Sequence, residues 1–262
     1  MRCAVESREA RLKILVSLKR VPDPDTRIRL KPDGSGVDLD GVKFAVNPFD
    51  AIALEEALRI REKLGEIEVV VVSIGAEDCI EQLRVGLAMG ADRALLIKTF
   101  ENLDSLAVAK VLAALYRREQ PRFVLMGKQA IDDDSNQAGQ MLAALLGIGQ
   151  ATFVSKLELI ENNTQARCAR ETDAGIETIT IKLPTIITTD LRLNEPRYVS
   201  LPGIMKARKK PLEEIALADL GVAAASRTTV LKLEAPAQRK AGVRVKTVDE
   251  LVGKLKNDAK VI

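Results

Sequence analysis

Residues 123–147, FVLMGKQAIDDDSNQAGQMLAALLG, predict a strand, a polar loop and a helix in immediate succession. The strand is the apolar run 123–126, and Asp134 or Ser135 can act as the N-cap of the helix that follows. The helix is indicated by apolar residues at helical spacing, which are Met141, Leu142, Leu145 and Leu146. A strand that leads through a short loop into a helix is the unit from which α/β folds are built.

The loop of this unit carries side chains that suit an anionic ligand. The first turn of a helix leaves backbone N–H groups without intrahelical partners, at the positive end of the helix dipole. Gly127 allows a ligand to approach the backbone, and Lys128 supplies a positive charge. The amides of Gln129, Asn136 and Gln137 can orient a phosphate, a ribose or a base. We therefore predict a nucleotide site at this loop.

Helix capping alone is the competing interpretation. Many α/β turns carry Gly at the strand end and Asp or Ser at the helix start for capping only. Asp132, Asp133 and Asp134 would repel an anion unless they point outward or pair with Lys128. The loop is not a P-loop, because Gly127 and Lys128 are not followed by Ser or Thr and the upstream glycine of that motif is missing.

The chain on the N-terminal side of this unit alternates between strands and helices. Apolar runs at 14–21, 68–75 and 93–97 predict strands, and helices are predicted at 51–64, 78–89 and 105–117. This alternation predicts an α/β fold, in which a twisted parallel sheet is flanked by helices in a Rossmann-like nucleotide-binding arrangement over residues 13–210. Ligands of such sheets bind at the carboxyl ends of the strands. Ser17, the segment 47–50, Ile74 and Gly127 lie at such ends, so one crevice can collect them.

The predicted helix at 51–64 has one apolar face. Ile52 falls off this face, and we expect four polar positions to stay exposed to water: Glu55, Glu56, Arg59 and Lys63.

The C-terminal part of the chain has a different pattern. Strands are predicted at 151–159 and 167–183, followed by a buried run at 185–191. Large apolar residues are then sparse from Pro211 until a short amphipathic helix at 248–255. We expect residues 211–262 to form an extended arm that packs on a partner subunit; the alternative is that it packs on its own domain. Residues 1–12 are predicted to be a disordered leader.

The amino-acid composition argues against several classes of function. The 262 residues carry a net charge of +3 and 3% aromatic residues, which argues against nucleic-acid binding. The chain has no histidine, so Ser-His or Cys-His catalysis and imidazole metal ligands are absent. Three scattered cysteines without a CxxC argue against a disulfide framework and a thiolate zinc site. No apolar run is long enough for a membrane span, so we expect no direct membrane insertion.

Several motifs, in order, resemble those of electron-transfer flavoprotein β subunits. The segments are LKRV at 18–21, NPF at 47–49, AMGADR at 88–93, GKQAIDDDSNQAGQ at 127–140, DLRLNEPRY at 190–198 and LPGIMKARKK at 201–210. The resemblance covers the chain from about Lys13 to its C-terminus. It implies an electron carrier without catalytic residues of its own, in a heterodimer whose α subunit holds most of a redox-active FAD while the β subunit holds a structural AMP.

The resemblance also implies which residues bind AMP. They are Ser17, Asn47, Pro48, Phe49, Asp50, Ile74, Gly127, Lys128, Gln129, Ala130, Ile131, Asp132, Asp133, Asp134, Ser135, Asn136, Gln137 and Ala138. Phe49 would also lie near the edge of the flavin ring.

Further positions carry roles by the same resemblance. Glu171 matches a position tied to electron transfer, and Leu201 matches the leucine that docks into a partner dehydrogenase; the alternative is that Leu201 packs on its own subunit. Lys206 and Lys209 would steer that encounter. The chain departs from the family pattern at three positions, which are Pro24 in place of a tyrosine, Ala174 in place of a glycine and Gly203 in place of an asparagine.

The implied partners are the α subunit, acyl-CoA dehydrogenases and a membrane quinone oxidoreductase. The location would be cytoplasmic in a bacterium and the mitochondrial matrix in a eukaryote. Three alternatives remain at this stage: a free-standing nucleotide-binding regulatory protein, an NAD-dependent dehydrogenase, and a bifurcating flavoprotein subunit with a second FAD in place of AMP. Against the dehydrogenase, no GxGxxG follows a predicted strand. The DLRLNEPRY segment is more similar to that of AMP-binding members than to that of bifurcating members.

Overall fold

The computed structural model describes residues 12–238 and 241–262. The predicted leader at 1–12 lies outside the described residues, apart from Leu12, which begins the first strand.

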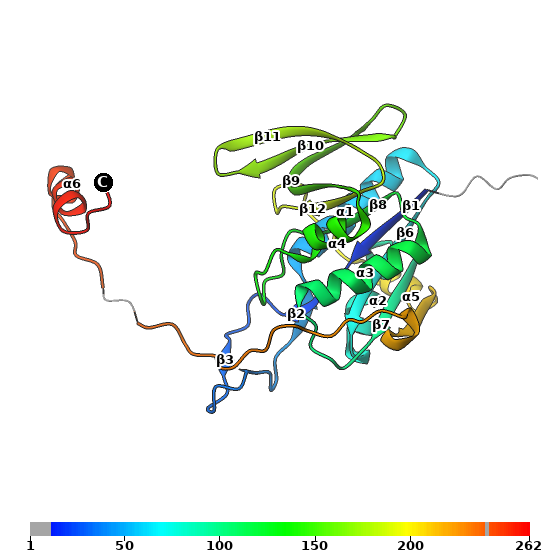
Figure 1. The fold of residues 1–262 in the computed structure, drawn as a ribbon, viewed down its shortest axis with the longest axis horizontal. Coiled ribbons are helices and arrows are strands. Elements are labelled where there is room, and N and C mark those ends of the chain that lie inside the picture. The colour runs from blue at the N-terminus through cyan, green and yellow to red at the C-terminus, as the bar shows by residue number, and fades with distance from the viewer. Residues whose placement is uncertain (1–11, 239–240) are drawn as a thin grey trace, which may run out of the picture. The chain divides into compact units, whose positions relative to one another are not determined.

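The described residues contain a sheet of nine strands (Figure 1). Its members are β1 (Leu12–Ser17), β6 (Ile67–Gly75), β7 (Arg93–Lys98), β8 (Phe123–Gly127), β9 (Gly149–Ile160), β10 (Gln165–Thr172), β11 (Gly175–Lys182), β12 (Thr185–Thr189) and β13 (Leu212–Ala216). The order across the sheet is β11-β10-β9-β12-β8-β1-β6-β7-β13. Every pairing from β9 across to β13 is parallel, whereas β10 runs antiparallel to both β9 and β11. The predicted parallel sheet is confirmed.

Helices cover both faces of this sheet. They are α1 (Pro48–Leu64), α2 (Ile80–Met89), α3 (Ser105–Glu119), α4 (Ala138–Leu146) and the short α5 (Leu201–Ala207). A further helix, α6 (Val248–Asn257), lies near the C-terminus of the sequence and is not part of this layer. Successive strand residues point to opposite faces, so Val16 packs in one core with α1 and α2 while Leu15 packs in a second core with α3 and α4. Burial on both faces explains why β6 reads as a continuous apolar run.

The expected exposed face of α1 is partly wrong. Ile52, Glu55 and Glu56 are buried, because the segment that follows β12 lies over them. Arg197 Nε donates to Glu55 Oε2 at 2.8 Å, and Asn194 Nδ2 donates to Glu56 Oε2 at 3.0 Å. The same Asn194 amide also donates to the carbonyl oxygen of Ile52 at 3.1 Å. Hydrogen bonding from these distant polar groups makes the burial of the two carboxylates tolerable.

Short strands form two additional pairs. The predicted strand at 14–21 breaks after Ser17, and β2 (Arg20–Pro22) pairs with β5 (Phe44–Val46) outside the main sheet. A second pair joins β3 (Arg29–Leu30) and β4 (Val37–Asp38).

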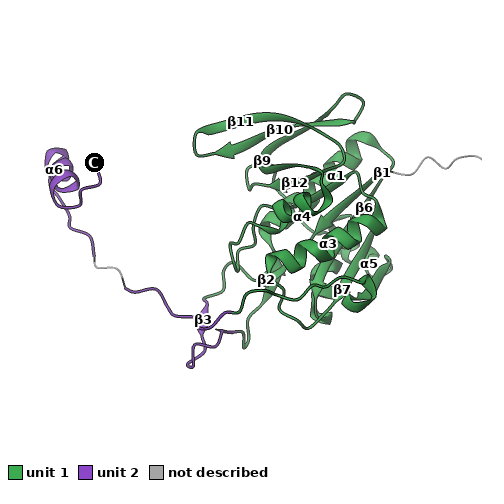
Figure 2. Cartoon of the chain, viewed as in Figure 1, with its two compact units in different colours: residues 1–27, 39–229 green, residues 28–38, 230–262 purple. Residues whose placement is uncertain are grey.

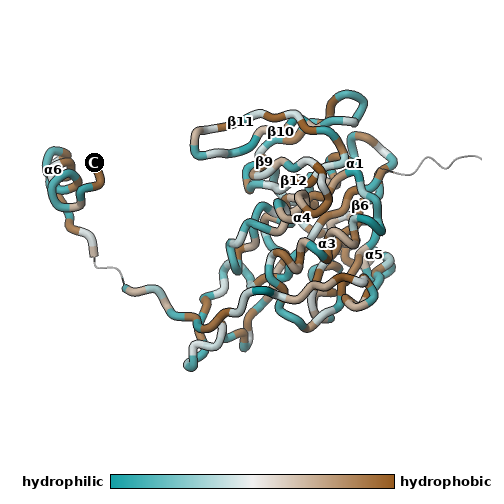
Figure 3. Tube along the Cα trace, viewed as in Figure 1, coloured by the Kyte–Doolittle hydropathy of each residue, from teal (hydrophilic) through white to brown (hydrophobic). Residues whose placement is uncertain are grey.

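The chain divides into two compact units (Figure 2). Unit 1 comprises residues 1–27 and 39–229, of which those from Leu12 are described, and unit 2 comprises residues 28–38 and 230–262. The first part of the expected arm therefore belongs to unit 1, where β13 pairs with β7. Within unit 2, Leu233 N donates to the carbonyl oxygen of Gly34 at 2.9 Å. Helix α6 carries both hydrophilic and hydrophobic residues (Figure 3).

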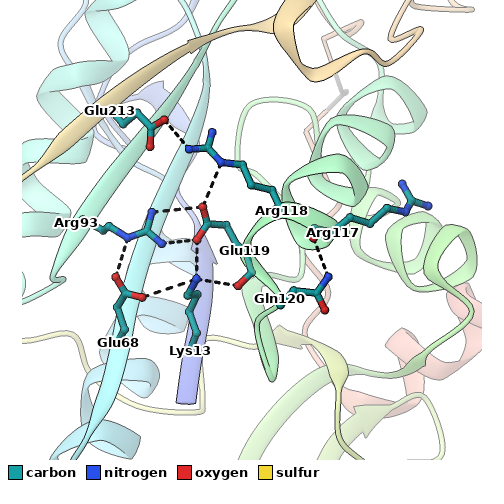
Figure 4. A network of polar contacts seen from close by, with 8 residues as sticks. All are labelled: Lys13, Glu68, Arg93, Arg117, Arg118, Glu119, Gln120 and Glu213. Carbon is teal, nitrogen blue, oxygen red and sulfur yellow. Dashed lines mark hydrogen bonds and ion pairs between the residues drawn. The ribbon is translucent and has the colours of Figure 1, made fainter. Parts of the chain in front are cut away.

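A polar network joins the amino ends of the central strands (Figure 4). Lys13 Nζ lies 2.8 Å from Glu119 Oε2, and Arg93 pairs with Glu119 and with Glu68. Burial alone would raise the pKa of Glu119, but the hydrogen bonds from Arg93 and Lys13 hold the pKa of this carboxyl below its ordinary value. The network ties α3 to β1, β6 and β7 at the amino edge, opposite the edge where the predicted nucleotide site lies.

None of the helices in the described residues is long and apolar enough to cross a bilayer.

Candidate functional site

The sheet has its topological switch point between β1 and β8. From β1 the chain passes through α1 to β6 on one side, whereas β8 lies on the other side of β1. Ser17 ends β1, Gly127 ends β8, and Ile74 lies near the end of β6. A switch point at the carboxyl ends of parallel strands is where α/β sheets bind ligands. The structure thus brings these predicted positions to one edge.

The first turn of α1 lies between the loop that follows β1 and the loop that follows β8. Asp50 accepts two backbone hydrogen bonds, from Gly127 N to Oδ1 and from Lys19 N to Oδ2, each at 2.8 Å. Asn47 Nδ2 donates to the carbonyl oxygen of Gln129 at 2.9 Å, and Ile131 N donates to Asn47 Oδ1 at 3.3 Å. Asn47 and Asp50 therefore hold the loops of the site together.

Gly127 is packed closely against α1. A Cβ at this position would lie 2.6 Å from Phe49 Cβ and 2.7 Å from Asp50 Oδ1. The absent side chain allows α1 to approach the end of β8. The Thr189 hydroxyl fixes the same turn of α1 by donating to the carbonyl oxygen of Phe49 at 3.0 Å.

The loop between β8 and α4 keeps the helix N-terminus open. Neither Asp134 nor Ser135 is the N-cap, because α4 begins at Ala138. Asp134 and Asn136 adopt left-handed backbone angles, with φ of 49° and 47°, which a right-handed helix excludes. The actual N-cap, Gln137, makes no side-chain capping hydrogen bond. No side chain at the N-cap therefore occupies the N–H groups of the first turn, as an anion site requires.

The carboxylates of this loop do not pair with Lys128, which was one of the two arrangements considered. Lys128 Nζ lies 2.8 Å from Asp190 Oδ2 and 4.9 Å from the centre of the Phe153 ring. Asp132 and Asp133 pair with Lys19 instead, at 2.8 and 2.9 Å. Asp134 Oδ1 accepts a hydrogen bond from Gln129 Nε2 at 2.7 Å.

The pKa values follow these pairings. Burial would raise the pKa of Asp190 and of Asp133, but the hydrogen bonds that both carboxylates accept hold each pKa below its ordinary value. Burial would lower the pKa of Lys19, and its two carboxylate partners raise it above the ordinary value instead. Lys19, Asp133 and Asp190 are therefore charged at neutral pH.

Sequence reasoning missed Lys19, Gln140 and Asp190. Gln140 Nε2 donates to Asn136 Oδ1 at 2.8 Å, while its Oε1 is buried and has no hydrogen-bond partner among the described residues. An unpaired buried acceptor beside the uncapped helix start suits a ligand that carries a hydrogen-bond donor. Lys19 and Asp190 each follow a buried strand, and this position in the sequence could have identified them as candidates for the site.

Glu171 is connected to the same site by polar contacts. It lies on β10 and pairs with Arg192, whose backbone N donates to Asp190 Oδ1 at 3.1 Å. Asp190 in turn binds Lys128. Two ion pairs and one backbone hydrogen bond thus link the expected electron-transfer position to the β8–α4 loop.

Leu201 is the first residue of helix α5. Ser200 is the N-cap, and its hydroxyl accepts a hydrogen bond from Gly203 N at 3.2 Å. The Leu201 side chain is 74% exposed, so it does not pack on its own subunit. Lys206 and Lys209 are exposed as well.

Comparison with known proteins shows the family of this chain. The family model described as "Electron transfer flavoprotein domain" matches residues 36–220. The electron transfer flavoprotein subunit beta of Bradyrhizobium diazoefficiens is 57% identical over 251 residues, covering 96% of this chain and all of the relative. The chain belongs to the electron transfer flavoprotein β-subunit family.

Other β subunits of this family come from eukaryotes. The relative named "Electron transfer flavoprotein subunit beta, mitochondrial" from Arabidopsis thaliana is 52% identical over 251 residues. The electron transfer flavoprotein subunit beta of Homo sapiens is 49% identical over 256 residues. Both alignments cover 96% of this chain and all of the relative. As an electron transfer flavoprotein β subunit, the chain is an electron-carrier component that functions with a flavin and an α subunit.

Proposed function

We propose that this β subunit holds one structural AMP in the crevice between β1 and β8. Its α partner then holds FAD, and the heterodimer carries electrons from acyl-CoA-type dehydrogenases to a quinone oxidoreductase. The observation that carries the AMP assignment is the uncapped start of α4 at the switch point of the sheet. A monophosphate suits N–H groups at a helix N-terminus.

The surrounding residues fit the rest of a nucleotide. The side chain of Ile131 is 36% exposed and Ile74 is half-buried, so apolar surface is available beside the loop for a base. Gln140 Oε1 is an acceptor that a ribose hydroxyl or an exocyclic amine can satisfy. In this proposal, Asn47, Asp50 and Gly127 position the loops, and Gln137 to Gln140 supply polar contacts to the ligand.

FAD on the α subunit supplies the redox chemistry of the complex. The β chain binds and orients the nucleotide and excludes water from the site. These functions need neither a histidine nor a metal. Among the described residues, no group of three or more Cys, Asp or Glu side chains is placed to hold a metal ion.

The nucleotide content of the purified heterodimer tests this function. Heating and deproteinisation should release one AMP and one FAD per heterodimer, as measured by chromatography. Two FAD without AMP would assign the chain to the bifurcating type, and a colourless β homodimer would favour a regulatory protein.

We further propose that Leu201 enters a pocket on the partner dehydrogenase. Burying a leucine side chain contributes about 1.5 to 3 kcal/mol, so Leu201→Ala should weaken docking roughly 10- to 150-fold. The measurement is steady-state electron transfer from an acyl-CoA dehydrogenase, with FAD content and thermal midpoint as controls. An unchanged apparent Michaelis constant would refute this role.

Lys206→Gln and Lys209→Gln should change the salt dependence of association more than the residence time.

A further inference from the structure

Lys19 is the point at which three segments of the site meet. Its backbone N donates to Asp50 Oδ2 at 2.8 Å, and its carbonyl oxygen accepts a hydrogen bond from Asn47 N at 2.9 Å. Both partners belong to the buried start of α1. The backbone of Lys19 is therefore fixed to the core, even though it lies in a loop.

The side chain of Lys19 reaches the third segment, the β8–α4 loop. Its Nζ lies 2.8 Å from Asp132 Oδ1 and 2.9 Å from Asp133 Oδ2, across 113 and 114 positions of sequence. Lys128, the lysine within the loop itself, is paired with Asp190. In the described part of the chain, Lys19 is the cation that pairs with these two carboxylates.

This pairing changes the net charge of the loop that precedes α4. The start of α4 attracts negative charge, but Asp132, Asp133 and Asp134 precede it within a few residues. Without Lys19, two of these carboxylates would be uncompensated next to a phosphate, and like charges at close range repel strongly in a partly buried site. The two ion pairs are half-exposed, so they contribute little to the free energy of unfolding. Their main effect is on the electrostatic potential at the start of α4.

We propose that Lys19 is a positioning and specificity-determining residue of the nucleotide site. It does not contact the ligand; it neutralises Asp132 and Asp133 and fixes the β8–α4 loop, so that the site accepts a phosphate monoester. This inference rests on the proposed function, because it assumes that AMP binds here. It implies that the loss of Lys19 weakens the binding of the phosphate group and leaves the binding of the nucleoside unchanged.

Calorimetric titration of nucleotide-depleted heterodimer with AMP and with adenosine tests the inference. Lys19→Gln should weaken AMP binding roughly tenfold and leave adenosine binding nearly unchanged, since adenosine carries no charge. Lys19→Arg should retain most of the AMP affinity. Adding Asp132→Asn and Asp133→Asn to Lys19→Gln should restore AMP binding, because the uncompensated charges are removed. Lys63→Gln, an exposed lysine on α1, makes the same change in net charge and should leave both affinities unchanged.

The outcomes separate the two levels of inference. If the wild type binds no AMP, the proposed function fails and the role of Lys19 fails with it. If the wild type binds AMP and Lys19→Gln binds it equally well, or loses AMP and adenosine alike, only the role of Lys19 is overturned. Lys19→Arg guards against misfolding of Lys19→Gln, because it keeps the positive charge beside Asp132 and Asp133 and tests the same position with the charge intact.

Discussion

Asp50 is the residue on which the geometry of the nucleotide site depends most. It is 4% exposed and accepts backbone hydrogen bonds from two different loops. Burial raises the pKa of Asp50 to about 6, and the hydrogen bonds from Lys19 and Gly127 offset only part of that effect. A carboxyl whose pKa lies close to physiological pH makes the site sensitive to mild acid.

The difference between the folded and unfolded pKa values of Asp50 determines whether stability rises or falls with pH. The pKa of Asp50 is about 6 in the folded chain against an ordinary value of 3.8, so the folded state binds the proton more tightly. Protonated Asp50 therefore favours folding below pH 4, and this contribution is lost as the pH rises through 6. Relative to Asp50→Asn, the free energy of unfolding of the wild type should fall by at most about 1.4 kcal/mol per pH unit across this window. Urea unfolding of both proteins from pH 4.5 to 7.5 measures it, and a difference independent of pH would contradict the prediction.

At the scale of elements, the packing of α5 on α2 determines how Leu201 is presented. The two helices approach closely at Gly203, where an added Cβ would lie 2.7 Å from the carbonyl oxygen of Ala88 and 3.2 Å from Ser200 Oγ. Ser200 is also the N-cap of α5. The glycine that departs from the family pattern therefore allows this close contact, and the docking segment is a short helix packed on the fold.

Gly203→Ala should separate α5 from α2. Because the Cβ meets backbone as well as the capping hydroxyl, we expect a loss of about 1 to 3 kcal/mol in the free energy of unfolding and faster amide exchange over residues 199–208. Gly253→Ala is a matched control, since a Cβ there meets nothing within 4 Å. It should stabilise α6 by up to about 1 kcal/mol. Equal exchange rates over 199–208 in wild type and Gly203→Ala would refute the packing argument.

At the scale of the whole molecule, α6 belongs to unit 2, and its apolar residues are not buried within that unit. Thr247 caps this helix by accepting a hydrogen bond from Glu250 N at 3.2 Å, and Val248, Leu251 and Val252 are each at least 44% exposed. Unit 1 holds both hydrophobic cores. An amphipathic helix without its own core is typical of an arm that binds another chain, and we propose that the α subunit covers it.

Leu251→Asp should therefore weaken the heterodimer without unfolding unit 1. Loss of one buried leucine contact corresponds to at least roughly a tenfold higher dissociation constant, measured by sedimentation of the mixed subunits. Asn257→Asp adds the same charge at the end of α6 and should have a smaller effect. If Leu251→Asp lowers the thermal midpoint of the β chain alone, the helix packs on its own subunit.

Local patterns in the sequence determined the layout of this protein. The spacing of apolar residues placed the strands and helices of the α/β sheet, and the polar residues at strand ends pointed to the edge where we propose the nucleotide site, because periodicity and turn chemistry act over a few neighbouring residues. The motifs at 47–49 and 127–140 identified the family for the same reason, since each is a contiguous segment.

Only the tertiary structure decided how the residues of the site are used. Gly127 serves the approach of α1, Lys128 pairs with Asp190, and Lys19 reaches across 113 positions to Asp132. Glu55 and Glu56 are buried because a segment more than 130 positions away supplies their hydrogen-bond donors. Ion pairs and steric contacts depend on which distant segments the fold brings together, and that information is absent from any local stretch of sequence.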